Sequence, residues 1–380
     1  MNAQSNLNKK IGILGGGQLG RMLLQEGINL NLDLHFLDAK NAPCEANSKN
    51  FNIGSIVSYE DVYNFGKSLD FITIEIENVN VEALYQLEKE GVKVFPQPHI
   101  IELIQDKGLQ KQFYQKNGIP TSPFLLIENK EELANSNFGF PCIQKLRKGG
   151  YDGKGVQKLN TISNLEDAFT APSLLEELID FEKELSVIVA RTESGETKCF
   201  PVVEQEFNAE ANLVEFLFSP ADITNEVAKE AEKIAIQIID KLGMVGLLAV
   251  ELFLTKEGKL LVNEIAPRPH NSGHQTIEGN ITSQFGQHLR SIINLPLGDT
   301  STVQPAVMIN LLGAKNHTGK ATYNGLPEAL SQPGVYPHLY GKKDTKPFRK
   351  MGHITVTNPD ISAAKKIARN LLTTVEVVAE

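Results

Sequence analysis

Two glutamates, Glu251 and Glu264, lie in a segment that is typical of a β-hairpin. In VELFLTKEGKLLVNE, residues 250–264, apolar and branched residues alternate on either side of Glu257-Gly258, which predicts a two-residue turn. Pairing outward from that turn sets Glu251 directly opposite Glu264. Because like charges that face each other destabilise a strand pair, the arrangement favours a bound cation. Two carboxylates suit Mg²⁺, with Mn²⁺ as a substitute, held together with the phosphates of ATP.

The residues around the second glutamate strengthen this interpretation. Asn263 offers a further oxygen ligand, and the segment IAPRPHNSGH begins directly after Glu264. It brings Arg268, His270 and Asn271 within a few residues of the carboxylates, where they could contact a reacting group. For an isolated pair of glutamates, a solvated side chain and a register shifted by one residue would be the simpler interpretation. His270 could equally be a core histidine, because the prolines beside it shape the backbone by themselves.

A first glycine-rich segment, GGGQLG, lies between a predicted strand and a predicted helix. Gly15, Gly17 and Gly20 match the GxGxxG pattern, and Asp38 closes the next predicted strand. This pattern is typical of a dinucleotide site, so an NAD-dependent oxidoreductase is an alternative. Backbone N–H groups at a helix N-terminus bind other phosphates as well, including that of a nucleotide monophosphate. A tight turn that binds no ligand also remains open.

A second glycine-rich segment, RKGGYDGKG at residues 147–155, lies between two predicted strands. It therefore does not open a helix as a Walker A loop does. Its glycines and its three basic side chains suit a flap that closes over a polyphosphate, although an ordinary charged hairpin tip has the same composition. Lys145 lies on the apolar strand before this loop, and a lysine that faces inward needs an anionic partner.

The elements that carry these residues divide the chain into three predicted regions. Residues 1–98 show the strand, turn, helix and strand order of a parallel α/β domain. Residues 99–297 contain short strands, the loop 147–155 and a long amphipathic helix over 221–242, which predicts an α+β domain with antiparallel strands. Residues 298–380 contain two strands and a final helix, and they predict a small α+β unit.

The composition limits the class of partner. The chain has 380 residues, of which 41% are hydrophobic and 22% charged, and this predicts a globular protein of two or three domains. Its net charge of −9 disfavours a nucleic-acid surface, and no apolar run reaches a membrane-spanning length. Three widely separated cysteines without CxxC spacing predict neither disulfides nor zinc, as expected in a reducing cytoplasm. We expect small-molecule partners, with no nucleic acid and no membrane.

The motifs together resemble one family, the ATP-grasp carboxylases of purine synthesis known as N5-carboxyaminoimidazole ribonucleotide synthetases. The resemblance extends over nearly the whole chain, in the order GGGQLGRM, Lys107, Lys145, GGYDGKG, LLEELI followed by Glu184, AVELF, VNEIAPRPHNSGH and YGKKDTKPFRKMGH. It implies an ATP-grasp fold, with ATP between two α+β subdomains, and a homodimer. Phe348 departs from the family pattern, because a glycine is common at that position.

The resemblance also implies a role for each matching residue. The predicted nucleotide residues are Lys107, Lys145, Gly149, Gly150, Tyr151, Asp152, Gly153, Lys154, Gly155, Glu176, Glu177, Leu178, Ile179, Glu184, Phe207, Asn263 and Glu264. Within this set, the lysines outside the flap contact phosphates, residues 176–179 the adenine edge and Glu184 the ribose. Glu251 and Glu264 are the predicted metal ligands. The predicted ribonucleotide residues are Gln18, Leu19, Glu75, Tyr151, Asp152, Lys342 and Arg349.

Two of these ribonucleotide assignments keep alternatives at this point. Glu77 could replace Glu75, because residues two apart on a strand share one face. Lys342 and Arg349 could belong to a solvated basic loop, which is what composition alone would favour.

The expected reaction joins bicarbonate to 5-aminoimidazole ribonucleotide through carboxyphosphate, with ADP and phosphate as by-products. Arg268, His270, Asn271 and Tyr151 are the predicted catalytic residues; Arg268 and Asn271 hold the labile intermediate, and the Tyr151 flap shields it. Alternatives are another ATP-grasp ligase, such as a formate-using ribonucleotide transformylase, the NAD-dependent oxidoreductase, or a nucleotide-sensing module without turnover.

Overall fold

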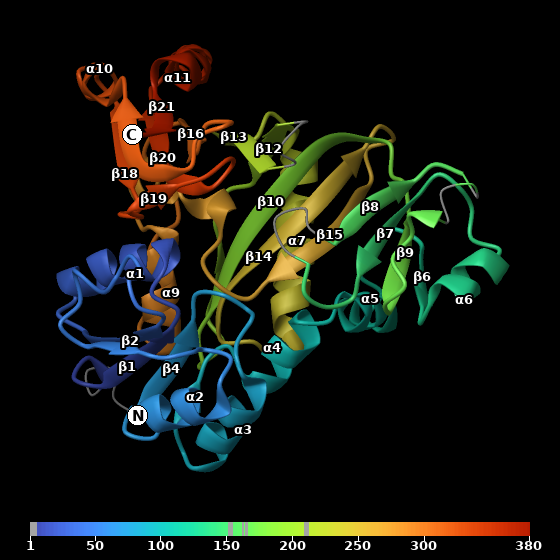
Figure 1. Cartoon of the computed structure of the whole chain (residues 1–380), viewed down its shortest axis with the longest axis horizontal. Coiled ribbons are helices and arrows are strands. Elements are labelled where there is room, and N and C mark those ends of the chain that lie inside the picture. Colours follow the sequence, from blue (N-terminus) through green and yellow to red (C-terminus); the bar gives the residue numbers. More distant parts are fainter. Residues whose placement is uncertain (1–5, 151–154, 162, 164–165, 209–212) are drawn as a thin grey trace.

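The structure is a computed structural model, and it describes residues 6–150, 155–161, 163, 166–208 and 213–380. Its strands form a parallel N-terminal sheet, a small antiparallel sheet, a large central sheet and a three-stranded C-terminal sheet (Figure 1). Among the described residues, no helix is both long and apolar enough to cross a membrane.

The N-terminal sheet is the predicted parallel α/β domain. Its strand order is β3-β2-β1-β4-β5, and every pairing is parallel. The strands are β1 (Lys10–Leu14), β2 (Asp33–Asp38), β3 (Phe51–Ile53), β4 (Phe71–Ile74) and β5 (Lys93–Val94), and the helices between and after them are α1 (Gln18–Asn29), α2 (Tyr59–Gly66), α3 (Val81–Lys89) and α4 (Pro98–Ile104). All four residues of β4 are buried, as expected for a parallel strand covered on both faces.

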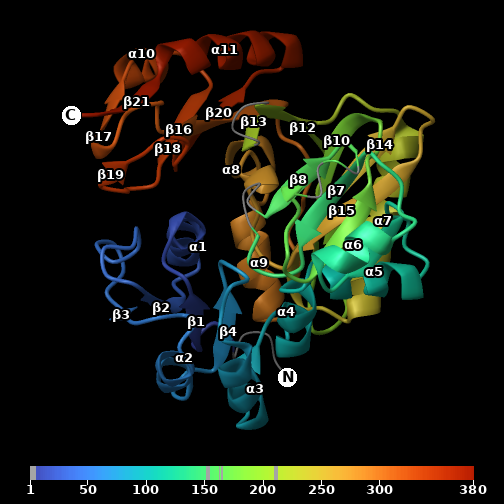
Figure 2. The same ribbon diagram turned by 45° about the vertical axis from the view of Figure 1, so that its right-hand side comes forward.

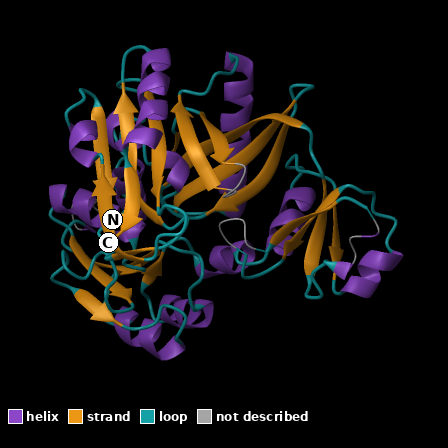
Figure 3. Cartoon of the chain, turned by 45° about the horizontal axis from the view of Figure 1, so that its top comes forward, coloured by secondary structure: helices purple, strands orange, loops and turns teal. Residues whose placement is uncertain are grey.

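The small antiparallel sheet has the order β6-β9-β7-β8. It forms a separate lobe of the molecule (Figure 3). Its elements are β6 (Phe124–Ile127), β7 (Cys142–Leu146), β8 (Val156–Leu159) and β9 (Ser173–Glu177), with α5 (Lys107–Lys116) and α6 (Lys130–Asn135) nearby. Asp106 caps α5 by accepting from the N–H groups of Gly108 and Leu109. The cap begins the helix at Lys107 and so sets the direction of that lysine.

The large sheet continues into the C-terminal region. Its order is β15-β14-β10-β12-β13-β16-β20-β18, with β11 paired to β10. The strands are β10 (Phe181–Arg191), β11 (Thr197–Cys199), β12 (Val203–Asn208), β13 (Leu213–Ser219), β14 (Gly246–Thr255), β15 (Leu260–Ala266), β16 (Ala306–Leu312), β18 (Val335–Leu339) and β20 (Lys350–Thr357). Three strands after residue 297, β16, β18 and β20, therefore extend the central sheet, which the sequence did not indicate.

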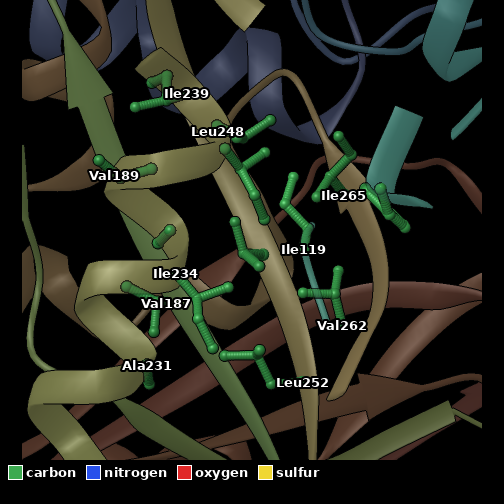
Figure 4. Close-up of a cluster of buried hydrophobic side chains, with 14 of the residues drawn as sticks. Ile119, Val187, Val189, Ala231, Ile234, Ile239, Leu248, Leu252, Val262 and Ile265 are labelled. Atoms are coloured by element: carbon green, nitrogen blue, oxygen red, sulfur yellow. The ribbon is translucent and has the colours of Figure 1, made fainter. Parts of the chain in front are cut away.

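Helix α7 (Asn225–Leu242) covers one face of this sheet. Its N-cap is Thr224, whose side chain accepts from the Val227 N–H, and Gly243 ends it in the left-handed conformation at φ 60°. Apolar residues of α7 pack on inward-facing residues of β10, β14 and β15 (Figure 4). Each such fully buried aliphatic side chain contributes about 1.5–3 kcal/mol, so this core holds the β14–β15 hairpin rigidly.

Two further packings join the regions. Helix α9 (Gln284–Ile292) places Phe285 and Leu289 in one core with Leu19 and Leu23 of α1. Helix α11 (Ile361–Thr374) covers strands β16 and β20 (Figure 2). The remaining elements are α8 (Thr276–Gly279), α10 (Leu326–Leu330), and the sheet β19-β17-β21, made of β19 (Asp344–Thr345), β17 (Gly319–Asn324) and β21 (Glu376–Ala379).

Candidate active site

The β14–β15 hairpin sets Glu251 opposite Glu264, which confirms the predicted pairing. The predicted two-residue turn is wrong. Gly258 N donates to Thr255 O over 2.9 Å and Gly258 has φ 78°, so the loop has three residues, 256–258. The register then shifts by one residue between Glu251 and Leu252, which leaves Asn263 as the extra residue of a bulge. The bulge compensates for the longer turn and restores the glutamate pair.

The two carboxylates have different surroundings. Lys107 forms an ion pair with Glu264, and this ammonium group lowers the pKa of the Glu264 carboxyl. Burial raises the pKa of Glu251, and the charge of Glu264 raises it further. His270 Nε2 lies 3.7 Å from Glu251 Oε1. Glu251 is therefore the member of the pair whose negative charge is the less stabilised by the protein.

These surroundings fit a magnesium ion that is shared with a ligand. The described residues contain no group of three or more His, Cys, Asp or Glu side chains that could hold a metal by themselves. Mg²⁺ is commonly held by only one or two carboxylates together with substrate phosphates and water. A cation at the pair would also offset the penalty that raises the pKa of Glu251.

A cavity of about 360 Å³ opens beside this pair, between the small sheet and the large sheet. Many of the predicted site residues line it: Lys145, Glu176, Glu177, Leu178, Ile179, Glu184, Phe207, Glu251, Asn263, Glu264, His270 and Asn271. Phe181 and Phe253 stack at a centroid distance of 4.7 Å on its wall. One end is thus apolar and the other end is charged, as suits a base joined to a polyphosphate.

Lysine side chains form ion pairs and hydrogen bonds at the charged end of the cavity. Lys145 Nζ lies 2.6 Å from Glu176 Oε2 and donates to Asn263 Oδ1 over 2.9 Å. Lys107 does not line the large cavity; it lines a smaller one that it shares with Lys145 and Glu264. Burial raises the pKa of Glu184 to about 7, although Lys145 opposes the shift.

The predicted residues of the IAPRPHNSGH segment do not all lie at the cavity: His270 and Asn271 line it, and Arg268 lies elsewhere. His270 Nδ1 accepts from the Ser272 N–H over 3.3 Å, so the proton of a neutral ring lies on Nε2, which faces Glu251. Asn271 exchanges hydrogen bonds with Asn310 of β16. Arg268 does not line the cavity; it forms an ion pair with Glu77 over 2.9 Å.

The backbone N–H groups of the first glycine loop donate to carboxylates of the protein itself. Gly17 N donates to Glu75 over 2.7 Å, Gly20 N also donates to Glu75, and Gly16 N donates to Asp38 over 2.7 Å. A Cβ atom on Gly17 would lie 2.4 Å from Glu75 Oε1. Burial raises the pKa of Glu75 to about 7, against the effect of these N–H groups. The glycines make room for Glu75 rather than for a dinucleotide pyrophosphate.

Three of the predicted ribonucleotide residues, Gln18, Leu19 and Lys342, lie where the N-terminal and C-terminal regions meet. Lys342 Nζ donates to Gln18 Oε1 over 2.8 Å, at the first residue of α1, and Leu19 follows in the same turn. Glu75 and Glu77 do not share one face of a strand, because β4 ends at Ile74. Glu75 lies in the glycine loop, whereas Glu77 pairs with Arg268.

Comparison with known proteins gives the family. Models described as "Ribonucleotide synthetase preATP-grasp domain", "ATP-grasp domain" and "Phosphoribosylaminoimidazole carboxylase C-terminal domain" match residues 8–105, 112–285 and 306–367. The N5-carboxyaminoimidazole ribonucleotide synthase of Synechococcus elongatus is 37% identical over 379 residues, which cover 97% of this chain and 95% of that protein. This chain belongs to the N5-carboxyaminoimidazole ribonucleotide synthase family.

Solved structures agree with this assignment and confirm the ATP-grasp fold. The Thermotoga maritima synthetase is 43% identical with a TM-score of 0.91, covering 98% of this chain and 100% of that one. An Aspergillus clavatus synthase complexed with ATP is 35% identical with a TM-score of 0.89, covering 97% and 98%. Some relatives are longer: the chain spans 36% of a bifunctional purine synthesis protein of Dictyostelium discoideum and 63% of the Saccharomyces cerevisiae phosphoribosylaminoimidazole carboxylase. Membership of this family decides against the NAD-dependent alternative.

Phe348 adopts a left-handed backbone conformation in the C-terminal segment. Phe348, at the position where the family commonly has glycine, has φ 60° and donates its N–H to Gly313 O over 2.9 Å. A left-handed residue is therefore required here, and glycine adopts that conformation at lower cost. Arg349 next to it donates to Asp344 O over 2.7 Å. Neither Arg349 nor Lys342 lines the large cavity, whereas Lys350 does.

The flap segment is described only in part. Gly149, Gly150 and Gly155 are described, with φ 80° at Gly149 and 73° at Gly155. The predicted site residues Tyr151, Asp152, Gly153 and Lys154 lie outside the described residues. Arg147, one of the three basic side chains of this loop, is paired within the protein. Its Nε and Nη2 donate to both carboxylate oxygens of Asp106 over 3.0 and 2.8 Å.

Sequence reasoning missed two lysines of this region. Lys350 lines the cavity, and the motif RKMGH around it directed attention to the neighbouring Arg349. Lys111 is buried and lies 2.5 Å from Glu176 Oε1. Its spacing of four residues from Lys107 on a predicted helix was the available signal, because such residues share one face.

Proposed function

We propose that this protein is an ATP-dependent carboxylase that joins bicarbonate to the exocyclic amine of 5-aminoimidazole ribonucleotide in purine synthesis. The products are N5-carboxyaminoimidazole ribonucleotide, ADP and phosphate. The observation that carries the proposal is the cavity in which an apolar wall, the lysines and the Glu251–Glu264 pair meet. The relatives support it, since one Aspergillus clavatus structure is described as a complex with ADP and 5-aminoimidazole ribonucleotide.

In this proposal ATP lies along the cavity from its apolar end to its charged end. Residues 176–179 and Phe207 surround the adenine, and Glu184 accepts from the ribose. Lys107 and Lys145 contact the phosphates, and the flap 147–155 closes over them. Support comes from the lining of the cavity and from the position of both lysines beside Glu264.

Glu251 and Glu264 would hold Mg²⁺ together with the phosphates. When bound, the ion neutralises charge on the phosphoryl group that is transferred. Lys107 forms an ion pair with Glu264, and both carboxylates of the pair line the cavity. The protein residues therefore orient the phosphates and balance their charge, and they form no covalent bond with the substrate.

The reaction has two bond-forming steps. A bicarbonate oxygen attacks the γ-phosphorus and the bond to the ADP oxygen breaks, which gives carboxyphosphate. The amine nitrogen of the ribonucleotide then attacks the carboxyl carbon, phosphate leaves with the C–O bonding electrons, and the amine proton is released. Asn271 is proposed to hold the intermediate together with Arg268, and His270, which presents its Nε2 beside Glu251, is proposed to position it. Arg268, paired with Glu77, is proposed to meet bicarbonate from the N-terminal side.

The ribonucleotide is proposed to bind at the junction of the N-terminal and C-terminal regions. The N–H groups that begin α1 at Gln18 and Leu19 face its phosphate together with Lys342 and Arg349, and Glu75 contacts the substrate nearby. We further propose the division into domains 1–98, 99–297 and 298–380, a homodimer, and a location in the cytoplasm.

The test is ADP release by the purified protein with Mg·ATP. We expect release only when both 5-aminoimidazole ribonucleotide and bicarbonate are present, and restoration when bicarbonate is added back to a depleted assay. Release that requires formate and glycinamide ribonucleotide instead would overturn the proposal in favour of a transformylase. Tight ATP binding without turnover under every substrate combination would support a sensing module.

A further inference from the structure

Lys111 is a buried lysine to which the proposed reaction assigns no part. It lies one helical turn after Lys107 on α5, so both side chains leave the same face of the helix. Lys107 reaches Glu264, whereas Lys111 points into the interior toward Glu176 of β9. Its exposed fraction is only 2%. A charged side chain that is this deeply buried requires specific partners.

The contacts around Lys111 suit a charged ammonium group, although burial lowers its pKa and Glu176 opposes that shift. Thr121 Oγ1 donates its hydrogen to Val262 O over 2.6 Å, and Ser122 Oγ donates its hydrogen to Glu176 Oε1 over 2.6 Å. Each hydroxyl has one hydrogen, so each must accept from Lys111 Nζ, which lies 2.5 and 3.1 Å away. Glu176 Oε1 lies 2.5 Å from Nζ and forms an ion pair with it. Two hydroxyl acceptors and one carboxylate therefore surround the buried ammonium group.

Glu176 lies between this ammonium group and a second one. Its Oε1 faces Lys111 and its Oε2 faces Lys145 at 2.6 Å. Burial by itself would raise the pKa of Glu176, but Lys145 and Lys111 outweigh it and lower the pKa to about 2. Two cations and one anion leave this buried triad with one net positive charge, and only Lys145 and Glu176 of the triad line the large cavity.

We propose that Lys111 is a positioning residue that neutralises Glu176 from the interior side, so that the positive charge of Lys145 remains available to the phosphates in the cavity. Without Lys111, Glu176 and Lys145 would neutralise each other and the triad would carry no net charge. Lys145 would also be drawn toward Glu176 and away from Asn263, the neighbour of Glu264. The inference rests on the proposed function, because it requires ATP in this cavity.

The test compares ATP with adenosine at constant Mg²⁺, because adenosine lacks the phosphates. The measured quantity is the ratio of the adenosine Kd to the ATP Kd, which isolates the contribution of the phosphates. In Lys111→Met we expect this ratio to fall roughly tenfold or more, the effect of losing one charged contact, with adenosine binding little changed. The control is Lys116→Met, an exposed lysine on the same helix, which should leave the ratio unaltered.

A second substitution separates charge balance from packing. Lys111→Met combined with Glu176→Gln restores one net positive charge, so the ratio should return close to that of the unaltered protein. If Lys111 contributes only to packing, adding Glu176→Gln should not restore the ratio of the two Kd values. That result would overturn the inference. Equal losses of ATP and adenosine affinity in Lys111→Met would overturn it as well.

Two further results have their own interpretation: a Lys111→Met variant that does not fold, and an unaltered protein that does not prefer ATP to adenosine. If Lys111→Met does not fold, the double variant should still show the unaltered ratio and Glu176→Gln alone should show a higher one; failure of either expectation rejects the inference. If the unaltered protein binds ATP no more tightly than adenosine, the proposed ATP site is wrong, and the inference is rejected together with it.

Discussion

The two glutamates of the hairpin should respond differently to the same substitution. Glu264 is paired with Lys107, whereas burial and the charge of Glu264 raise the pKa of Glu251. Without metal, Glu264→Gln leaves the Lys107 ammonium without its carboxylate, and we expect the free energy of unfolding to fall by about 1–3 kcal/mol. Glu251→Gln removes a like charge across the strand pair and keeps an oxygen that can face His270, so we expect no loss and a gain of up to about 1 kcal/mol.

With ligand, both variants should show the same loss relative to the unaltered protein. At a Mg·ATP concentration of about 100 times Kd, the unaltered protein gains about 2.7 kcal/mol of stability. If either substitution weakens binding about 100-fold, the same concentration equals the new Kd, and the gain falls to about 0.4 kcal/mol. Both variants should therefore lose most of the stabilisation by Mg·ATP, and both should lose ADP release.

The assay is urea unfolding with and without Mg·ATP. The control is Glu257→Gln, in the exposed turn of the same hairpin, which should match the unaltered protein in both conditions. Equal destabilisation of both variants without metal would refute the asymmetric pair. Full retention of the Mg·ATP gain by both would refute the metal assignment.

Three further predictions concern other parts of the site. Lys342→Ala should raise the KM for the ribonucleotide about 10- to 100-fold, and that for ATP little, because it loses about 1.5–3 kcal/mol of charged hydrogen bonding; a larger change in the KM for ATP would contradict the assignment. The pKa of Glu184 is raised from 4.5 to about 7, so the folded state keeps a proton that the unfolded state has released, and stability falls as pH rises between these values. The measurement is the free energy of unfolding by urea at pH 5 and at pH 7.5. Glu184→Gln should lack this contribution to the decrease, whereas the exposed Glu182→Gln should retain it. Mg·ATP should raise the melting temperature and NAD should not, since Glu75 and Asp38 occupy the amides of the glycine loop; a larger shift with NAD would contradict this reasoning.

Local patterns in the sequence predicted much of this protein. The parallel N-terminal domain, the short antiparallel strands, helix α7 and the pairing of Glu251 with Glu264 each depend on the spacing of residues close together in the chain. Such spacing is visible in a sequence, because the period of a helix or strand decides which side chains share a face. The motifs, taken in order, were also sufficient to indicate the family.

Where local reasoning was wrong, neighbours outside the segment decided the result. The hairpin turn has one residue more than predicted, and the bulge at Asn263 offsets it. Glu75 and Glu77 are separated because β4 ends before them, and their partners come from the glycine loop and from Arg268. Arg147 lies in the flap segment but is held by Asp106, the cap of α5.

By itself the sequence determined the local elements, the glutamate pair and the family. Only the tertiary structure decided that strands β16, β18 and β20 extend the central sheet, that Lys107 neutralises one glutamate of the pair, and that Lys111 meets Glu176 in the interior. The physical reason is that an ion pair depends on the distance between two side chains. For Lys107 and Glu264, which are 157 residues apart, that distance is set by the packing of α5 against the hairpin and by no pattern within either segment.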